Sequence, residues 1–473
     1  MPRTSSLASV HLEVGEKPEQ IQPVDDDTPF RILVAGDFSG GAGRVRKPIE
    51  IDRDNFDQVM GVIAPELRIA FGGQPVSIKF RELDDFHPDQ LFERLAPFQA
   101  LRDMRRNLSD SATFAATAAQ FAPPAPPPQA KAAGAQAPEP PSNVSGADLL
   151  SQMMGESPAP ATPARAPEKS AWDQMLHDMV APYAEPKPDR RQPEWIARTD
   201  EAITGEMRGL LHSRAFQELE SAWRGLYFLV RRLETGENLK IFVLDLPQKE
   251  LLSGDGQSLL KRIAVDETVG TLGGVPWAVI AGVYWFGPED EAALMQIAGL
   301  ARRARAPFLS GVASEIVGLN KVFQTLRASG DAQFVGLALP RFLLRLPYGQ
   351  KTDSTERFDF EEMPDTPEHE RYLWGNPAIA CAYLLGEAFT RSGWRMRPGE
   401  VSEITGLPAH VYKTDGETQL KPCAEVLLTE EAAVILLDLG FMPLASIKGA
   451  DRVRLVRFQS FAKPATSLIG QWS

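Results

Sequence analysis

Cysteine, histidine and long apolar runs are all scarce in this chain of 473 residues. The two cysteines, Cys381 and Cys423, lie far apart and belong to no CxxC pair, which argues against a disulfide scaffold and a zinc site. No stretch reaches the ~18 apolar residues of a membrane-spanning helix, and no apolar signal segment follows Met1. We therefore expect a soluble, cytoplasmic protein that does not insert into membranes.

The charge balance and the missing motifs exclude further classes. A formal net charge of −13 opposes nucleic-acid binding through phosphate neutralisation. His369 and Glu370 begin an H-E-x-x-H zinc motif, but Leu373 stands where the second histidine belongs. The acidic stretch at residues 358–370 offers paired carboxylates, although a solvated acidic loop is the simpler interpretation. We predict that the chain is not an enzyme and has no catalytic residue, cofactor or metal.

A glycine-rich turn at residues 36–43 follows an apolar run and invites comparison with a phosphate-binding loop. Such a loop needs a lysine and a serine or threonine after its last glycine, whereas Gly41 precedes Ala42 and Gly43. Pro48 then starts an extended stretch, so no helix N-terminus points at the turn. We interpret the segment as a turn between a core strand and an edge segment, with a nucleotide-binding enzyme as a distant alternative.

Composition divides the chain into three parts. Residues 122–168 are dominated by proline, alanine and glutamine, a composition that cannot bury enough apolar surface to offset the entropy of ordering. This tether, semi-extended through its prolines, separates an N-terminal module (1–121) from a C-terminal module (169–473).

The N-terminal module is expected to mix strands and helices. We predict a strand at 30–35, a helix at 55–63, a half-buried strand through Val76, Ile78 and Phe80, and an amphipathic helix at 88–108. Asp52 or Asp54 is the candidate cap of the first helix, and Pro97 allows a break or kink in the second.

The sequence pattern of the C-terminal module also predicts a mixture of helices and strands. Helices are expected around Ile196–Leu211, from Ser213 to a stop at Gly236, at 287–305, at 377–391 between Asn376 and Gly393, and from Thr429 to Gly440. Strands are expected at 239–246, 276–286, 306–314 and 424–428, and a hairpin at 441–458 turning at 448–451. The predicted class is α+β, or mixed α/β.

Long ordered motifs carry a family resemblance in both modules. Residues 29–67 and 76–108 resemble the small contractile-sheath subunit of type VI secretion (TssB, or VipA). Residues 202–230, 339–362, 372–389, 406–429 and 437–460 resemble the large subunit (TssC, or VipB). In that family the two subunits are separate chains of one heterodimer, whereas here they are fused.

The resemblance implies a structural subunit of a cytoplasmic sheath that contracts to drive effector delivery. The implied partners are other sheath subunits including copies of itself, the inner tube protein, baseplate components and the recycling AAA+ ATPase (ClpV). A tether of about 50 residues would hold the two modules at millimolar-order effective concentration. Sequence does not decide whether the modules pair within one chain or between chains.

The resemblance departs from the family at the C-terminus. Large sheath subunits continue past the segment that ends here at Ser473, and their terminal segments interlace neighbouring subunits. We therefore expect the purified chain to form small oligomers rather than long tubes. The alternative function is a sheath-like accessory component, such as a cap or adaptor, that does not polymerise.

One short segment inside the tether has helical periodicity. Leu149, Leu150, Met153 and Met154 share one apolar face, with Ser145 as a candidate cap. In the family, a short helix at this place is recognised by the recycling ATPase, and an unpartnered nascent helix is the alternative. A second amphipathic stretch at residues 170–183 is expected to pack on the C-terminal module.

Overall fold

The computed structural model describes residues 24–121 and 189–473, except residues 42, 44, 72, 73, 314, 315, 317–321, 365 and 415. These residues fall into two compact units, those up to Gln99 with those from Ala202 onward, and those between Ala100 and Glu201. The first unit draws on both modules defined above, so the tether does not separate two independent domains.

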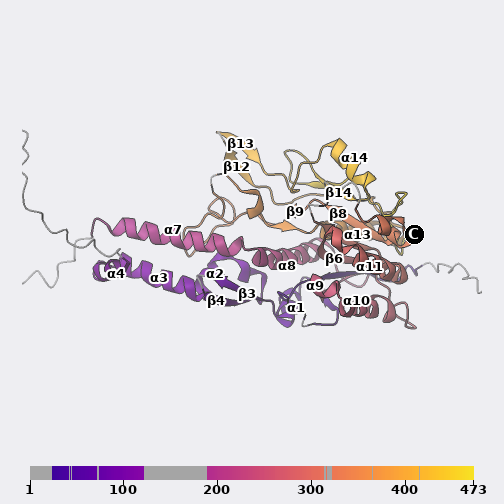
Figure 1. The fold of residues 1–473 in the computed structure, drawn as a ribbon, viewed down its shortest axis with the longest axis horizontal. Helices are drawn as coiled ribbons and strands as arrows, with labels where there is room; N and C mark the ends of the chain where they lie inside the picture. Colours follow the sequence, from indigo (N-terminus) through magenta and orange to yellow (C-terminus); the bar gives the residue numbers. More distant parts are fainter. Residues whose placement is uncertain are drawn as a thin grey trace, which may run out of the picture. The chain divides into compact units, whose positions relative to one another are not determined.

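The N-terminal module supplies short strands and helices. They are β1 (Phe30–Gly36), β2 (Ile49–Ile51), α1 (Phe56–Ile63), β3 (Glu66–Phe71), β4 (Gln74–Lys79), the 3-10 helix η1 (Leu83–Phe86), α2 (Pro88–Arg94), α3 (Ala96–Ser109) and α4 (Phe114–Phe121). In Figure 1 the violet elements α1, β3 and α2 lie beside the rose helix α8, with which β3 and η1 are in contact.

The C-terminal module supplies the longer elements. Its helices are α7 (Gln192–Leu211), α8 (Arg214–Arg232), α9 (Gln248–Leu251), α10 (Gly254–Lys261), α11 (Glu291–Ala304), α12 (Gln324–Ala328), α13 (Pro377–Ser392) and α14 (Glu430–Asp438), with a π turn at Arg262–Asp266. Its strands are β5 (Leu239–Asp245), β6 (Val279–Phe286), β7 (Phe308–Val312), β8 (Val335–Leu339), β9 (Phe342–Leu343), β10 (Trp374–Gly375), β11 (Glu403–Ile404), β12 (Val411–Thr414), β13 (Glu417–Leu420), β14 (Met442–Ser446) and β15 (Val453–Leu455).

A nine-stranded sheet forms the centre of the first unit. Its order is β11-β15-β14-β8-β7-β6-β1-β5-β2. The central strands from β5 to β14 run parallel to their neighbours, while β2, β15 and β11 are antiparallel additions at the two edges. This mixed sheet with its helices confirms the predicted α+β class.

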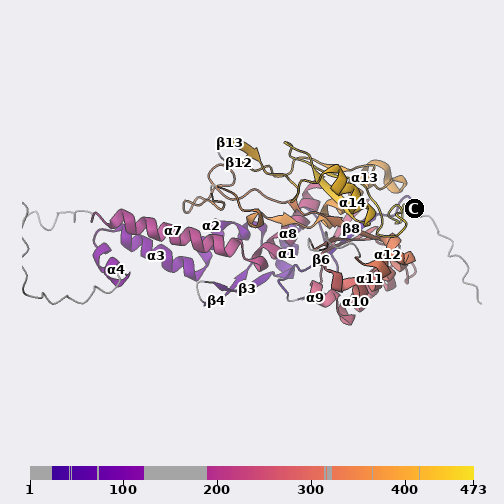
Figure 2. The same cartoon turned by 45° about the horizontal axis from the view of Figure 1, so that its top comes forward.

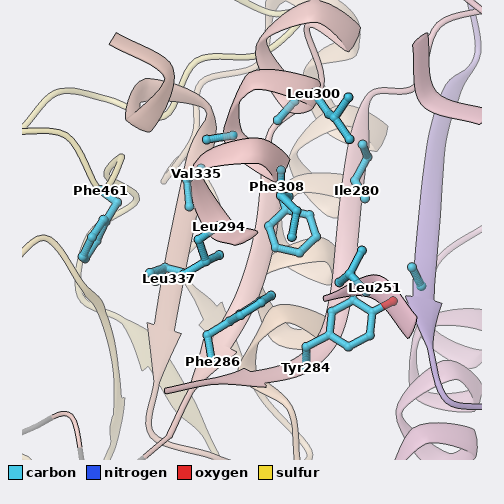
Figure 3. Close-up of a cluster of buried hydrophobic side chains, with 14 of the residues drawn as sticks. Leu251, Ile280, Tyr284, Phe286, Leu294, Leu300, Phe308, Val335, Leu337 and Phe461 are labelled. Atoms are coloured by element: carbon cyan, nitrogen blue, oxygen red, sulfur yellow. The ribbon is translucent and has the colours of Figure 1, made fainter. Parts of the chain in front are cut away.

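Helices cover both faces of this sheet, which is why its central strands are continuous apolar runs. In Figure 2, α10 and α11 lie on one side of β6 and β8, and α13 lies on the other. Figure 3 shows the first side, where Leu294 and Leu300 of α11 pack against Ile280, Phe308 and Val335 of the strands. Each of these five side chains is at most 5% exposed.

Capping residues set the helix ends largely where their types predict. Asn376 accepts the amide of Ala378 at the start of α13, and Thr429 accepts the amide of Ala432 at the start of α14. Gly393 and Gly440 follow these helices with positive φ angles of 56° and 92°, a conformation that glycine adopts without strain.

One predicted strand is wrong, and one predicted helix is divided. No strand forms at residues 424–428, where Ala424 makes only an isolated bridge and Val426 and Leu427 are exposed. The helix expected at 88–108 has the break that its proline allowed: two helices separate at Leu95, because Pro97 occupies the first turn of the second.

Two helix ends also differ from expectation. Asn55, rather than Asp52 or Asp54, stands at the N-cap position of α1, and Asp52 instead accepts the amides of residues 54 and 55 in the preceding turn. Helix α8 ends at Arg232, so Gly236 lies in the following turn and does not terminate the helix.

The second unit is helical and has its own small core. Leu108, Phe114 and Ala118 are buried there, with Trp195 and Ile196 packed against them. Gln192 donates from its side-chain nitrogen to the carbonyls of residues 108 and 109, at 2.8 and 2.9 Å. Like the first unit, this small core is therefore built from residues on both sides of the tether.

Candidate functional site at the junction of the two modules

The junction is centred on β1, the strand that the N-terminal module contributes to the large sheet. β1 pairs with β5 along its whole length, from Phe30 opposite Leu239 to Gly36 opposite Asp245, and its middle pairs with β6. In Figure 3 it is the pale violet strand beside the pink strands of the C-terminal module. Because the middle of β1 is hydrogen-bonded on both edges, the sheet is incomplete without this strand.

A buried tryptophan closes one side of this junction. Trp223 of α8 is 0% exposed, and its indole nitrogen donates to the carbonyl of Phe38 at 2.9 Å. The rings of Phe38 and Phe56 meet the Trp223 ring edge to face, at centroid distances of 5.3 and 5.8 Å. Such pairs add to the apolar burial, so α8 is fixed to the N-terminal module as well as to its own.

The glycine-rich turn after β1 is occupied by the protein's own carboxylates. Asp245 accepts the amides of Phe38 and Ser39 at 3.0 and 3.1 Å, and Asp37 accepts the amide of Gly41 at 2.7 Å. These backbone amides are the groups that a phosphate would need. The turn leads from the core strand β1 to the edge strand β2, as predicted, and its geometry disfavours a nucleotide.

A second contact joins the modules at α2, and we name it the clasp: Asp89, Phe92 and Glu93 of α2 against residues 356–358. The carboxylate of Asp89 accepts the amides of Glu356 and Arg357 at 2.9 and 3.0 Å. The Arg357 guanidinium lies 2.8 Å from the Glu93 carboxylate, and the rings of Phe92 and Phe358 stack at 4.4 Å. The clasp therefore holds a loop of the C-terminal module on a helix of the N-terminal module.

A buried charge network anchors the same loop on α8. Arg345 contacts Glu220 at 2.8 Å and Glu362 at 2.7 Å, and both carboxylates are 0% exposed. Arg224 also pairs with Glu220, and the amide of Tyr348 donates to Glu362. Two arginines thus balance two carboxylates, the condition under which charges are tolerated in a core.

The charge network corrects the interpretation of residues 358–370 as a solvated loop. Burial raises the pKa of Glu362, but the attraction of Arg345 and the hydrogen bonds from His212, Arg345 and Tyr348 outweigh it and lower the pKa to about 2. Glu362 is therefore a buried structural carboxylate, whereas its neighbour Glu361 is exposed.

One cluster has the residue types of a metal site, but cationic side chains already neutralise its carboxylates. His369, Glu370 and Glu425 place ligand atoms within 4.8 Å of one another. Arg341, however, forms ion pairs with both carboxylates, and the Lys421 ammonium donates to Nδ1 of His369 at 3.1 Å. Two cationic side chains already pair with these candidate ligands, so we interpret the cluster as an ion-pair network.

The remaining candidates for chemistry are also structural or lie outside the described residues. Cys381 and Cys423 are free and buried, and burial raises their thiol pKa values to about 12 and 11. The predicted ATPase-binding residues, Leu149, Leu150, Met153 and Met154, lie outside the described residues, as do the second amphipathic stretch and the tether boundaries. Among the helices that the structure describes, none combines the length and apolar character needed to cross a membrane.

Sequence reasoning missed the residues that hold the junction together. Glu220 flanks the apolar stripe of α8, and Arg345 interrupts the run Phe342–Leu346. A charge inside an apolar pattern is a signal for a buried ion pair, because an isolated buried charge is costly. Asp89 and Asp245 carry no comparable signal, since aspartates before turns and near helix starts are common.

Comparisons with known proteins match each module separately. The family described as "Type VI secretion system, VipA, VC_A0107 or Hcp2" matches residues 13–122. The family "VipB: EvpB/VC_A0108, tail sheath N-terminal domain" matches residues 193–324 and 320–462. A relative, the "Type VI secretion system sheath protein TssC1" of Pseudomonas aeruginosa, is 36% identical over 305 residues, which are 57% of this chain and 61% of that protein.

These matches define a type VI secretion sheath protein in which both kinds of sheath module occur in one chain. The VipB match covers more than half of the residues, and the chain belongs to the VipB tail sheath family, with a VipA domain preceding it. The TssB/TssC resemblance is thereby confirmed. The chain spans about 61% of the length of the TssC1 relative.

Proposed function

We propose that the chain is a structural subunit of a type VI secretion sheath and drives effector delivery when the sheath contracts. The observation that carries this proposal is the insertion of β1 between β5 and β6, which makes one sheet from a VipA-type and a VipB-type module. A chain built in this way supplies both sheath modules in a fixed one-to-one ratio.

The proposal includes an organisation and a set of partners. Residues 1–121 act as the small-subunit module, residues 122–168 as a linker, and residues 169–473 as the large-subunit module. The partners are other sheath subunits, an inner tube protein, baseplate components and a ClpV-like ATPase, in a cytoplasmic assembly. The role is mechanical, because the buried charges and carboxylate-filled turn described above serve packing rather than catalysis.

The decisive experiment follows the chain in living cells that carry the rest of the secretion machine. A fluorescently tagged chain is expected to form elongated structures that shorten on firing, and its deletion is expected to abolish effector secretion. Diffuse fluorescence together with normal secretion in the deletion strain would overturn the proposal. Arg345→Ala, which breaks the buried network, should abolish the structures, while Arg357→Ala at an exposed ion pair serves as the matched control.

The proposed ATPase site requires a separate test. A buried leucine or methionine contributes about 1.5–3 kcal/mol to such a helix-in-groove contact. Leu150→Asp should therefore weaken binding of the ATPase at least tenfold in a fluorescence-anisotropy titration with the full chain, without changing its melting temperature. Unchanged binding would show that Leu149, Leu150, Met153 and Met154 are not the recognised face.

A further inference from the structure

The apolar pattern of β1 does not define its register by itself. Ile32, Leu33, Val34 and Ala35 are each at most 1% exposed, so apolar side chains cover both faces of the strand. In a strand with one polar face, a slip of one residue would bury polar groups and expose apolar ones. The interior of β1 contains no such signal, so groups at its two ends must supply it.

Arg31 provides a contact at the beginning of the strand. Its guanidinium carbon lies 3.9 Å from the centre of the Trp277 ring and 4.7 Å from the centre of the Phe242 ring, and it donates to the carbonyl of Val275. Phe242 belongs to β5, and Trp277 lies just before β6, so one side chain contacts both neighbours. A slip of two residues moves the strand about 6.6 Å, beyond the reach of a cation–π contact.

Asp245 provides a contact at the other end. It is the last residue of β5, it is 1% exposed, and it accepts the amides of Phe38 and Ser39 directly after β1. In the observed register Asp245 lies opposite Gly36, which places the turn over its carboxylate. A slipped strand would remove both amides from a buried charge, which is a costly loss.

We propose that Arg31 and Asp245 are register-determining residues, which fix the register of β1 against β5 and β6. The biological purpose of a fixed register rests on the proposed sheath function, whereas the register itself does not. The register is a property of the single folded chain, so it can be measured without assembly of a sheath.

Cysteine pairs placed in the full-length chain can report the register. Ala35→Cys with Leu244→Cys reports the observed register, because these positions are partners across β1 and β5. Ala35→Cys with Leu246→Cys reports a slip of two residues towards the end of β5. Disulfide yields under mild oxidation are measured by peptide mass spectrometry, and far-ultraviolet circular dichroism checks that each chain is folded.

The double variant Arg31→Ala/Asp245→Ala should lower the yield of the native cross-link at least threefold and produce the slipped cross-link. Asp245→Asn keeps an acceptor oxygen and should retain the native cross-link. Val34→Ala, which destabilises β1 without touching its ends, is the matched control and should leave the ratio of the two cross-links unchanged.

Three outcomes would overturn the proposal. They are a folded double variant with the wild-type ratio, an equal loss of the native cross-link in Val34→Ala, and, where the double variant fails to fold, a folded Arg31→Ala chain with the wild-type ratio. None of these results bears on whether the chain forms contractile structures in cells. Failure of the sheath proposal would equally leave the register measurement intact.

Discussion

The two modules meet at two places that differ in chemistry, the inserted strand β1 and the clasp. Apart from Arg31, β1 is apolar and buried and lies between two strands, whereas the ion pair of the clasp joins side chains that are 58% and 39% exposed. Apolar burial is insensitive to salt, but exposed charge pairs are screened and contribute little. Insertion of β1 therefore contributes most of the free energy that stabilises the junction, while the clasp positions a loop.

The largest expected effect follows from removal of the tryptophan that closes the β1 junction. Trp223→Ala should lower the free energy of unfolding by about 3–5 kcal/mol, because a fully buried ring leaves a cavity and the carbonyl of Phe38 loses its donor. Urea unfolding monitored by circular dichroism measures this change. Val62→Ala, at a position that is 59% exposed, is the control and should have almost no effect.

The buried charge network should give stability a distinct pH dependence. Because the pKa of Glu362 is about 2 in the folded chain against an ordinary value of 4.5, its contribution is complete above pH 4.5 and is lost as the pH falls towards 2. The shift corresponds to about 3 kcal/mol.

Glu362→Gln should therefore be less stable at neutral pH and lose less stability on acidification. Urea unfolding at a series of pH values between 7 and 2 measures both slopes. Glu431→Gln, at an exposed position of α14, is the charge-matched control. Parallel curves for the wild type and Glu362→Gln would contradict the assigned pKa.

A smaller effect is expected from the hydrogen bonds of the clasp. Asp89→Ala removes the acceptor of two amides and should lower the free energy of unfolding by about 1 kcal/mol, since residues 356 and 357 are exposed and water can reach their freed amides. Hydrogen exchange of residues 356 and 357 should increase locally. A loss as large as that of Trp223→Ala would show that the clasp, too, is essential to the junction.

The smallest effect should come from the exposed ion pair. Arg357→Ala should change the free energy of unfolding by less than about 0.5 kcal/mol, and high salt should remove even that difference. Parallel urea titrations at low and high salt provide the measurement. A salt-independent loss above 1 kcal/mol would mean that Arg357 acts through its packing on the loop rather than through its charge.

Individual elements were readable from the sequence where the local signal was strong. The apolar run of β6 and the helix α13 between Asn376 and Gly393 lie where period and capping chemistry predict them. Residues 424–428 misled the prediction because exposed Val426 and Leu427 imitate a buried strand. A short apolar run has the same composition whether or not it is covered, and only tertiary contacts distinguish the two.

The order of the strands was not readable in the same way. Ile32, Ile241 and Ile280 are buried in three adjacent strands, but nothing in their patterns says that β1 lies between β5 and β6. The junction residues Asp89 and Asp245 were missed for a related reason, because their partners are backbone amides more than 200 positions away. Such partners leave no local spacing to detect.

The central place of β1 has a consequence for the timing of biosynthesis. Its two neighbours, Leu239–Asp245 and Val279–Phe286, are synthesised more than 200 residues after the strand itself. At about 5–20 residues per second, the nascent strand waits on the order of 10–40 seconds before its first edge can be paired. During that interval its apolar side chains are a target for chaperones, so the rate of translation and the supply of chaperones should govern the yield of native chains.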